Sequence, residues 1–388
     1  MPLENKVPRT APGTAAEPGP TIPGPQALSL RQVHRAASEL RRGLPVLVTG
    51  ETPLAVLAAE HAGRDSLAEL VSLGSEPPLL LLAPVRAAAV LRRPAEQTSP
   101  AIAIRVPDAL LDATFLRPLA DPTAKQPATA GMLEAVPLPP AAGAALALAK
   151  LARLLPAVLA VPAHADAAAE AARRNLIGVP AADVLTYPGA AAAGLRQIVS
   201  ADVPLADAPD SRVVAFRTEG SAIEHLAILI GRPEKAEAPL VRIHSECFTG
   251  DLLGSMRCDC GEQLRGAIRR MAEDGSGVLL YLAQEGRGIG LVNKLRAYTL
   301  QDRGLDTLDA NRVLGWGADE RNFLIGATML VQLGISRVRL LTNNPDKLAA
   351  LRACGVDVVG REAHMIPPNG VNDEYLATKA ARFGHLLD

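Results

Sequence analysis

The sequence predicts an α/β protein of two domains, in which a C-terminal mixed-sheet domain is preceded by an α/β accessory domain. Its 388 residues exceed the size of one typical domain and allow two separate cores. Short apolar runs typical of strands alternate with segments of helical spacing. Hydrophobic residues make up 48% of the chain and aromatic residues only 3%, which fits an α/β fold with many small-residue contacts.

Composition divides the chain into three segments. Residues 1–28 are rich in Pro, Gly and Ala and lack the pattern of a signal peptide, which predicts a disordered tail and a cytoplasmic protein. Residues 29–203 form the expected accessory domain, and residues 204–388 form the second domain. Asp, Pro and Ser accumulate over residues 201–217, so we expect a linker there.

In the accessory domain, helical spacing and short apolar runs place the elements. The expected elements are a helix over residues 29–42, strands over 45–49, 79–82 and 101–106, and a mainly helical Ala-rich stretch over 141–174, broken near Pro156 and Pro162.

The second domain shows a clearer alternation of strands and helices. Strands are expected over residues 225–230, 240–244, 278–282, 338–341 and 356–359, and helices over 320–333 and 346–353, with two more that end at Gly275 and Gly304.

Charge argues against a nucleic-acid or anionic-membrane partner, and hydropathy argues against a membrane span. Forty basic residues against 41 acidic ones leave a formal net charge of −1, so no nucleic-acid or anionic-membrane partner is expected. The most apolar stretch, residues 136–161, is interrupted by Pro and by charged residues before it reaches the length of a membrane span.

Three of the four cysteines, Cys247, Cys258 and Cys260, stand in a C-x10-C-x-C arrangement. Such clustering in a reducing compartment favours metal binding over disulfides. Three thiolates can fill three corners of a tetrahedral Zn2+ site and leave the fourth for water, as in catalytic sites. A closed structural site completed by His244 is an equally good interpretation of the spacing.

Three further segments carry residues suited to anion binding. Residues 284–291 place a carboxylate, a guanidinium and three glycines between a strand and a helix, residues 318–321 place a carboxylate beside an arginine, and residues 341–347 end in a lysine. Each segment alone is equally well explained as a Gly-rich turn or a capped helix start. Together they suggest recognition of a polyphosphate.

These segments occur in an order and at spacings that resemble the GTP cyclohydrolase II family. The resemblance covers the chain from residue 242 onward. The matching runs are Arg242–Asp251, Arg257–Gly261, Gln284–Leu291, Leu295–Tyr298, Asp309–Asn311, Ala318–Arg321, Leu341–Lys347 and Gly384–Leu387.

The resemblance implies zinc-dependent hydrolysis of GTP that opens the guanine imidazole ring. Formate and pyrophosphate would leave, giving 2,5-diamino-6-(5-phosphoribosylamino)pyrimidin-4-one, in the first step of riboflavin synthesis. One Zn2+ per subunit, Mg2+ on the triphosphate and a homodimer are implied as well.

The resemblance also assigns site residues. Cys247, Cys258 and Cys260 would bind zinc. Asp319 matches the proton acceptor, Tyr298 the tyrosine near the carbon that leaves as formate, and Arg321 the residue proposed to attack the α-phosphate. A guanidinium stays protonated, so stabilisation of transition-state charge is an equally good role for Arg321. The residues that would line the GTP site are Arg242, Ile243, His244, Ser245, Glu246, Gln263, Glu285, Gly286, Arg287, Thr307, Thr342 and Lys347.

One departure and two alternatives remain. Ala283 stands where the family commonly has Arg, which affects the expected efficiency. A silent nucleotide-binding or regulatory homologue is one alternative, against which Asp319, Arg321 and Tyr298 together argue. A variant that stops at a formylated intermediate or serves another pathway is the other, and Tyr298 disfavours early stopping.

The N-terminal half faintly resembles 3,4-dihydroxy-2-butanone 4-phosphate synthase, over residues 36–48 and 119–122. The acidic run that holds Mg2+ in that synthase is missing, and Thr49–Pro53 stands in its place. Glu51 alone cannot replace several carboxylates around a hard cation. We expect a degenerate synthase-like scaffold or an unrelated accessory domain.

Overall fold

The computed structural model describes residues 24–127, 131–367, 370–371, 373 and 382. Most of the predicted N-terminal tail and the Gly384–Leu387 run therefore lie outside the described residues. Two mixed sheets, each of seven strands among the described residues, organise the chain, which confirms the predicted α/β class. No helix in the described ranges combines the length and the apolar character that membrane crossing requires.

The first sheet has the strand order β5-β4-β3-β6-β2-β1-β7 and is antiparallel except between β1 and β7. Its strands are β1 (Val46–Thr49), β2 (Leu54–Ala58), β3 (Leu79–Leu82), β4 (Ile102–Arg105), β5 (Glu134–Val136), β6 (Ala157–Pro162) and β7 (Ile177–Pro180). The accompanying helices are α1 (Pro25–Arg41), α2 (Arg64–Ser72), α3 (Pro84–Leu91), α4 (Ala113–Ala120), α5 (Ala142–Leu151), α6 (Ala167–Arg173), α7 (Ala181–Ala193) and the short turns η1 (Ala59–His61) and η2 (Asp108–Leu110).

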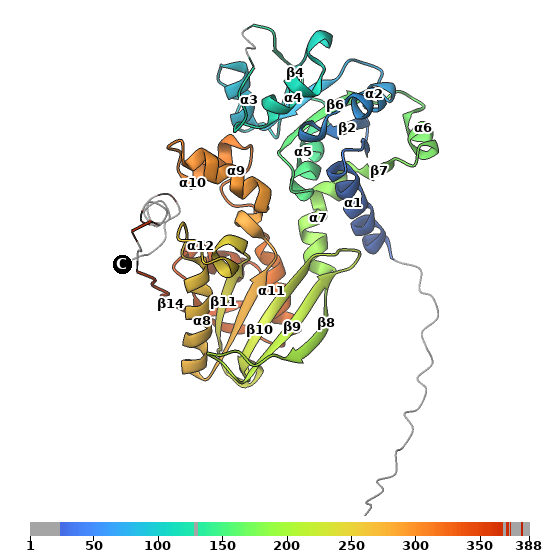
Figure 1. Cartoon of the computed structure of the whole chain (residues 1–388). Coiled ribbons are helices and arrows are strands. Elements are labelled where there is room, and N and C mark those ends of the chain that lie inside the picture. The colour runs from blue at the N-terminus through green and yellow to red at the C-terminus, as the bar shows by residue number, and fades with distance from the viewer. Residues whose placement is uncertain (1–23, 128–130, 368–369, 372, 374–381, 383–388) are drawn as a thin grey trace, which may run out of the picture.

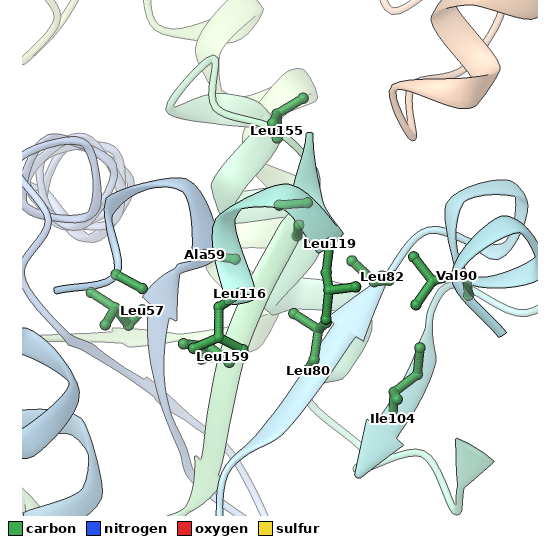
Figure 2. Packing of buried hydrophobic residues seen from close by; sticks show 14 of the residues in the cluster. Leu57, Ala59, Leu80, Leu82, Val90, Ile104, Leu116, Leu119, Leu155 and Leu159 are labelled. Atoms are coloured by element: carbon green, nitrogen blue, oxygen red, sulfur yellow. The ribbon is translucent and has the colours of Figure 1, made fainter. Parts of the chain in front are cut away.

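Alternation along the central strands buries both faces of this sheet. Leu80 and Leu82 of β3 face one apolar cluster, whereas Leu81 between them faces another, as the period of two in a strand requires. Figure 2 shows the first cluster, in which Leu80 and Leu159 lie beneath Leu116 of α4.

The second sheet has the order β14-β13-β11-β12-β10-β9-β8. Its strands are β8 (Leu195–Asp202), β9 (Ser211–Thr218), β10 (Glu224–Gly231), β11 (Leu240–Ser245), β12 (Ser276–Leu282), β13 (Arg337–Leu341) and β14 (Asp357–Glu362). Its helices are α8 (Cys260–Asp274), α9 (Leu291–Gln301), α10 (Thr307–Val313), α11 (Phe323–Gln332), α12 (Pro345–Ala353) and the short turns η3 (Pro233–Lys235), η4 (Phe248–Leu252) and η5 (Glu285–Gly288).

The order of these strands determines where a site can form. β11 runs parallel to both β12 and β13, so the carboxyl ends of all three strands meet at one edge of the sheet. The segments that follow them begin at Glu246, Ala283 and Thr342 and are thereby brought together. α8 covers one face of the sheet and α11 the other.

Two predictions about the elements are wrong. The expected linker over residues 201–217 is a β-hairpin, in which Ala201 pairs with Val213 inside the second sheet, and its turn holds both Pro residues and the Asp residues other than Asp202. The Ala-rich stretch over 141–174 contains β6, a central strand of the first sheet, because Pro156 and Pro162 bound a buried strand and do not break a helix.

The two halves share one core. α9 and α10 lie on the side of the second half that faces the first (Figure 1). Their apolar side chains, with those of the adjoining loops, belong to the same buried cluster as Leu80 and Leu159. The contributing residues are Ile289, Ala297, Leu300, Ala310, Leu314 and Trp316.

Candidate active site

Three buried or half-buried thiols meet beyond the end of β11. Cys247 is the second residue after the strand, Cys258 lies in the loop between η4 and α8, and Cys260 is the first residue of α8. Their sulfur atoms all lie within 4.8 Å of one another, and the Sγ atoms of Cys247 and Cys258 are 3.8 Å apart. This spacing suits three ligands of one metal ion.

Gly250 lets the cysteine loop close around this group. A Cβ atom at Gly250 would lie 2.8 Å from the Cys258 Sγ, 2.9 Å from the Cys260 Cβ and 3.0 Å from the Cys247 Sγ. The backbone N–H of Gly250 also donates to the Cys247 Sγ over 3.3 Å. A side chain here would therefore occupy the space in which the three sulfur atoms converge.

The charges around the thiols fit a bound cation. Hydrogen bonds from the neighbouring thiols, and from the Lys294 ammonium at 2.9 Å, lower the pKa of Cys247. The ionised Cys247 in turn raises the pKa of Cys258 to about 11, and it raises the pKa of Cys260. One thiolate opposes ionisation of the other two, and a dication such as Zn2+ would offset that repulsion, so the three thiols suit a metal-ligand set.

His244 does not complete the thiol group. Its Nε2 lies 3.1 and 3.2 Å from the two carboxylate oxygens of Asp251, and its ring stacks on Tyr281. Asp251 also accepts from the Tyr281 hydroxyl at 3.0 Å and from the Cys247 N–H at 2.9 Å. Among the described residues, the candidate metal group consists of the three cysteines alone.

Besides Lys294, four basic side chains line the same cavity as the thiols, namely Arg242, Arg287, Arg321 and Lys347. Burial lowers the pKa of Lys347 well below its usual value, and the charges of Arg321 and Arg242 lower it further. Burial lowers the pKa of Arg242 to about 10. An anion among these groups would relieve their mutual repulsion, so the cavity suits a polyphosphate.

The loop after β12 has an unusual backbone. Gly286, Arg287, Gly288 and Gly290 all have φ between 62° and 98°, in the left-handed region. Position 288 also has no room for a side chain, because a Cβ there would lie 2.8 Å from the carbonyl oxygen of Glu320. The loop therefore packs closely against the segment that carries Arg321.

Glu285 is occupied by the protein itself. Its carboxylate accepts from the N–H of Phe248 at 2.7 Å, from the N–H of Gly286 at 3.0 Å and from the Lys294 ammonium at 2.8 Å. The family resemblance places this carboxylate among the residues that would line the GTP site. In the structure it ties the loop after β12 to the cysteine loop.

Most predicted site residues line one cavity. These are Arg242, Ile243, His244, Ser245, Glu246, Cys247, Cys258, Cys260, Gln263, Glu285, Gly286, Arg287, Tyr298, Thr307, Arg321 and Lys347. Asp319 lines a neighbouring cavity, where it pairs with the Arg321 guanidinium, whose Nε lies 2.8 Å from its Oδ1. Thr342 is buried, and its hydroxyl accepts from the N–H of Asn344.

Sequence reasoning missed Lys294 and Asp251. Lys294 lies four residues before Tyr298 on α9, so helical spacing could have placed both on one face. Its ammonium bonds Thr249 as well as Cys247 and Glu285, and it lies 5.7 Å from the centre of the Tyr298 ring. Asp251 gives no comparable pattern, because its partners come from two different strands.

The chain is similar to known proteins of one enzyme family. The family model described as GTP cyclohydrolase II matches residues 196–363. A protein of Azospirillum brasilense named GTP cyclohydrolase-2 is 47% identical over 385 residues, covering 97% of this chain and 99% of its own. One of Xylella fastidiosa (strain Temecula1) with the same name is 39% identical, over 92% of this chain and 87% of its own.

Shorter matches and a structural likeness also occur. GTP cyclohydrolase-2 of Pasteurella multocida is 50% identical over 45% of this chain and 81% of its own. The crystal structure of a two-domain 3,4-dihydroxy-2-butanone 4-phosphate synthase from A. baumannii covers 86% of this chain and 100% of its own, at 17% identity and a TM-score of 0.34.

The fold, the site and the full-length relatives define the chain as an enzyme of the hydrolase class. It belongs to the GTP cyclohydrolase II family.

Proposed function

We propose that the protein hydrolyses GTP and opens the guanine imidazole ring, as the first step of riboflavin synthesis. Formate and pyrophosphate leave, and 2,5-diamino-6-(5-phosphoribosylamino)pyrimidin-4-one remains. The observation that carries the proposal is a single cavity lined by three convergent thiols and by five basic side chains. A nucleoside triphosphate offers both a ring carbon for hydrolysis and the anionic groups that these cations need.

Cys247, Cys258 and Cys260 would hold one Zn2+ per subunit. When bound, Zn2+ supplies Lewis acidity that makes a water molecule a usable nucleophile near neutral pH. Lys294 lies against the Cys247 sulfur and balances part of the thiolate charge. The Tyr298 hydroxyl lies 3.4 Å from the Thr249 hydroxyl, on the wall of the same cavity, and suits a role at the carbon that leaves as formate.

The cationic residues would bind the triphosphate together with Mg2+. Burial raises the pKa of Asp319, but the hydrogen bond and charge of Arg321 outweigh it and lower that pKa below its usual value. The pair therefore stays ionised, and Asp319 orients the guanidinium. A protonated guanidinium is a poor nucleophile, so we assign Arg321 to stabilisation of charge at the α-phosphate.

The assembly and compartment follow from the family resemblance. We propose a homodimer that works in the cytoplasm, without a nucleic-acid partner. The described part of the chain gives no helix suited to a membrane.

The test is incubation of the purified protein with GTP, Mg2+ and Zn2+, with formate and pyrophosphate assayed separately. Equal release of both supports the proposal. Pyrophosphate without formate would instead indicate a variant that stops at a formylated intermediate. GTP binding without either product would indicate a silent nucleotide-binding homologue.

A further inference from the structure

The end of α5 in the N-terminal half reaches two loops of the candidate active site. The Arg153 Nη2 donates to the carbonyl oxygen of Ala283 over 2.7 Å. The Lys150 ammonium lies 2.5 Å from the Glu320 Oε1. Ala283 precedes the loop that holds Glu285 and Arg287, and Glu320 stands next to Arg321. Lys150 in the last turn of α5 and Arg153 just after it therefore contact both loops.

The Ala283 residue is held through both of its backbone groups. Its N–H donates to the His225 Nδ1 at 3.1 Å, and its C=O accepts from Arg153. Burial, followed by the charge of Arg153, lowers the pKa of His225 to about 4, so the ring stays neutral and can accept this hydrogen bond. Without Arg153, the carbonyl would lose its partner at a half-buried place.

Arg153 is itself fixed against the far end of the same loop. Its φ of 57° is left-handed, and its carbonyl accepts from the Nδ2 of the buried Asn293 at 3.1 Å. A Cβ at Gly290 would lie 3.1 Å from the Cδ of Arg153, so the arginine stem packs on the backbone there. Arg153 therefore contacts the Gly-rich loop at Ala283 and at Gly290.

Lys150 ties the second segment to the first. The Glu320 carboxylate also accepts from the N–H of Gly317 at 2.7 Å, which fixes the turn before Arg321. The Glu320 N–H donates to the Arg287 carbonyl at 3.1 Å. The two loops are thus bonded to each other as well as to α5.

From these contacts we infer that Arg153 and Lys150 are positioning residues for GTP turnover, supplied by the N-terminal half. Several residues of the loop after β12 have left-handed φ, and glycine regains the most freedom when a contact is lost. Arg153 keeps this loop in the conformation that presents Arg287, and Lys150 keeps Arg321 beside it. This inference rests on the proposed function.

The test compares Arg153→Ala with the wild-type full-length protein. We expect kcat/KM for GTP to fall about tenfold, mainly through KM, with zinc content unchanged. Hydrogen exchange of the amides in residues 283–290 should become faster. Arg153→Lys should recover most of the loss, because its ammonium can donate to the same carbonyl.

Arg303→Ala is the matched control. Its Nη2 donates to the Thr123 carbonyl at 2.9 Å, across the same interface but away from both loops. It should leave kcat/KM and the exchange of residues 283–290 unchanged. An equal loss of kcat/KM in this control would mean that Arg153→Ala acts only by loosening the interface in general, and it would overturn the inference.

The exchange measurement also separates this inference from the proposed function. If the wild type released no formate, the proposed function would fail, and faster exchange in Arg153→Ala would still support the positioning role. Unchanged exchange and unchanged turnover in this variant would overturn the role. If Arg153→Ala did not fold, faster exchange of residues 283–290 in Lys150→Met would support the role, and unchanged exchange would overturn it.

Discussion

Single residues decide the chemistry beyond the end of β11. Three thiols converge there, but one thiolate suppresses the ionisation of the other two, and Lys294 supplies only one positive charge. A doubly charged ion, as proposed above, would balance the remaining negative charge when all three thiols are ionised. Loss of one of these three sulfur atoms should therefore reduce metal binding more than loss of a thiol elsewhere in the chain.

We expect Cys258→Ser to lose bound zinc and formate release, because two thiolates no longer complete the tetrahedral set. Metal content by mass spectrometry and a formate assay check this. Cys354→Ser is the control, since Cys354 lies at the end of α12 outside the thiol group, and it should retain both properties. Full turnover by a metal-free Cys258→Ser would contradict the zinc role.

Arg321→Ala and Asp319→Ala should keep their zinc and lose turnover. Removal of Arg321 takes one cation from the cavity, and removal of Asp319 frees the guanidinium that it orients. Loss of one such charge contact at a transition state typically costs about 10²–10³-fold in kcat. Steady-state kinetics with GTP provide the measurement. Wild-type kcat in either variant would remove that residue from the mechanism.

At the scale of residues, the sequence predicted most of the cavity lining but not the hydrogen bonds that hold the lining residues in place. Motifs placed sixteen of the eighteen proposed residues on one cavity. Asp319 lines the neighbouring cavity instead, with its side chain bonded to Arg321. Sequence does not give the direction of a side chain in a loop. The hydrogen bonds that occupy Glu285 come from three separate segments, so no local pattern reveals them.

At the scale of elements, the cysteine loop depends on one glycine. We expect Gly250→Ala to reduce zinc content and formate release, because its new methyl group would lie 3.0 Å or less from two sulfur atoms. Gly189→Ala, in α7 with no atom within 4 Å of the new methyl group, should leave both unchanged. Normal metal content in Gly250→Ala would show that the loop adapts without loss of the site.

The elements that sequence misassigned share a physical cause. β6 is short, and its Ala and Val residues face apolar layers on both sides, so it lacks the alternation that marks a half-exposed strand. The hairpin of β8 and β9 was hidden by its polar turn and by the exposed β8, whose residues after Leu195 face solvent. Tertiary pairing, not local pattern, decides both strands.

At the scale of the whole molecule, burial of neutral histidine makes stability depend on pH. The pKa of His225 is about 4 in the folded protein, below the usual 6.5, so the unfolded chain binds the proton more readily. Its stabilising contribution is complete above pH 6.5 and is lost as pH falls through 4. The loss reaches about 3 kcal/mol.

Urea unfolding at pH 7, 5.5 and 4.5 tests this expectation. His225→Asn cannot take up a proton in this range and retains an acceptor for the Ala283 N–H, so its free energy of unfolding should fall less with pH. His364, whose pKa is also lowered to about 4, should cause part of the fall in unfolding free energy at low pH in both proteins. Identical pH dependence in the two would contradict the role of His225.

The N-terminal half should lack 3,4-dihydroxy-2-butanone 4-phosphate synthase activity. That reaction needs Mg2+ held by clustered oxygen ligands, and no such carboxylate group occurs in the described part of this half. Glu51 is exposed in the turn after β1. The assay supplies ribulose 5-phosphate and Mg2+ to the full-length protein without GTP. Formate above background would reveal a diverged but working synthase.

The core shared by α9, α10 and the first sheet limits how this gene can be divided. A fragment that begins at Leu195 would turn the apolar side chains of Leu300, Leu314 and Trp316 toward water. We therefore expect either half expressed alone to expose apolar surface that the other half covers in the full-length protein.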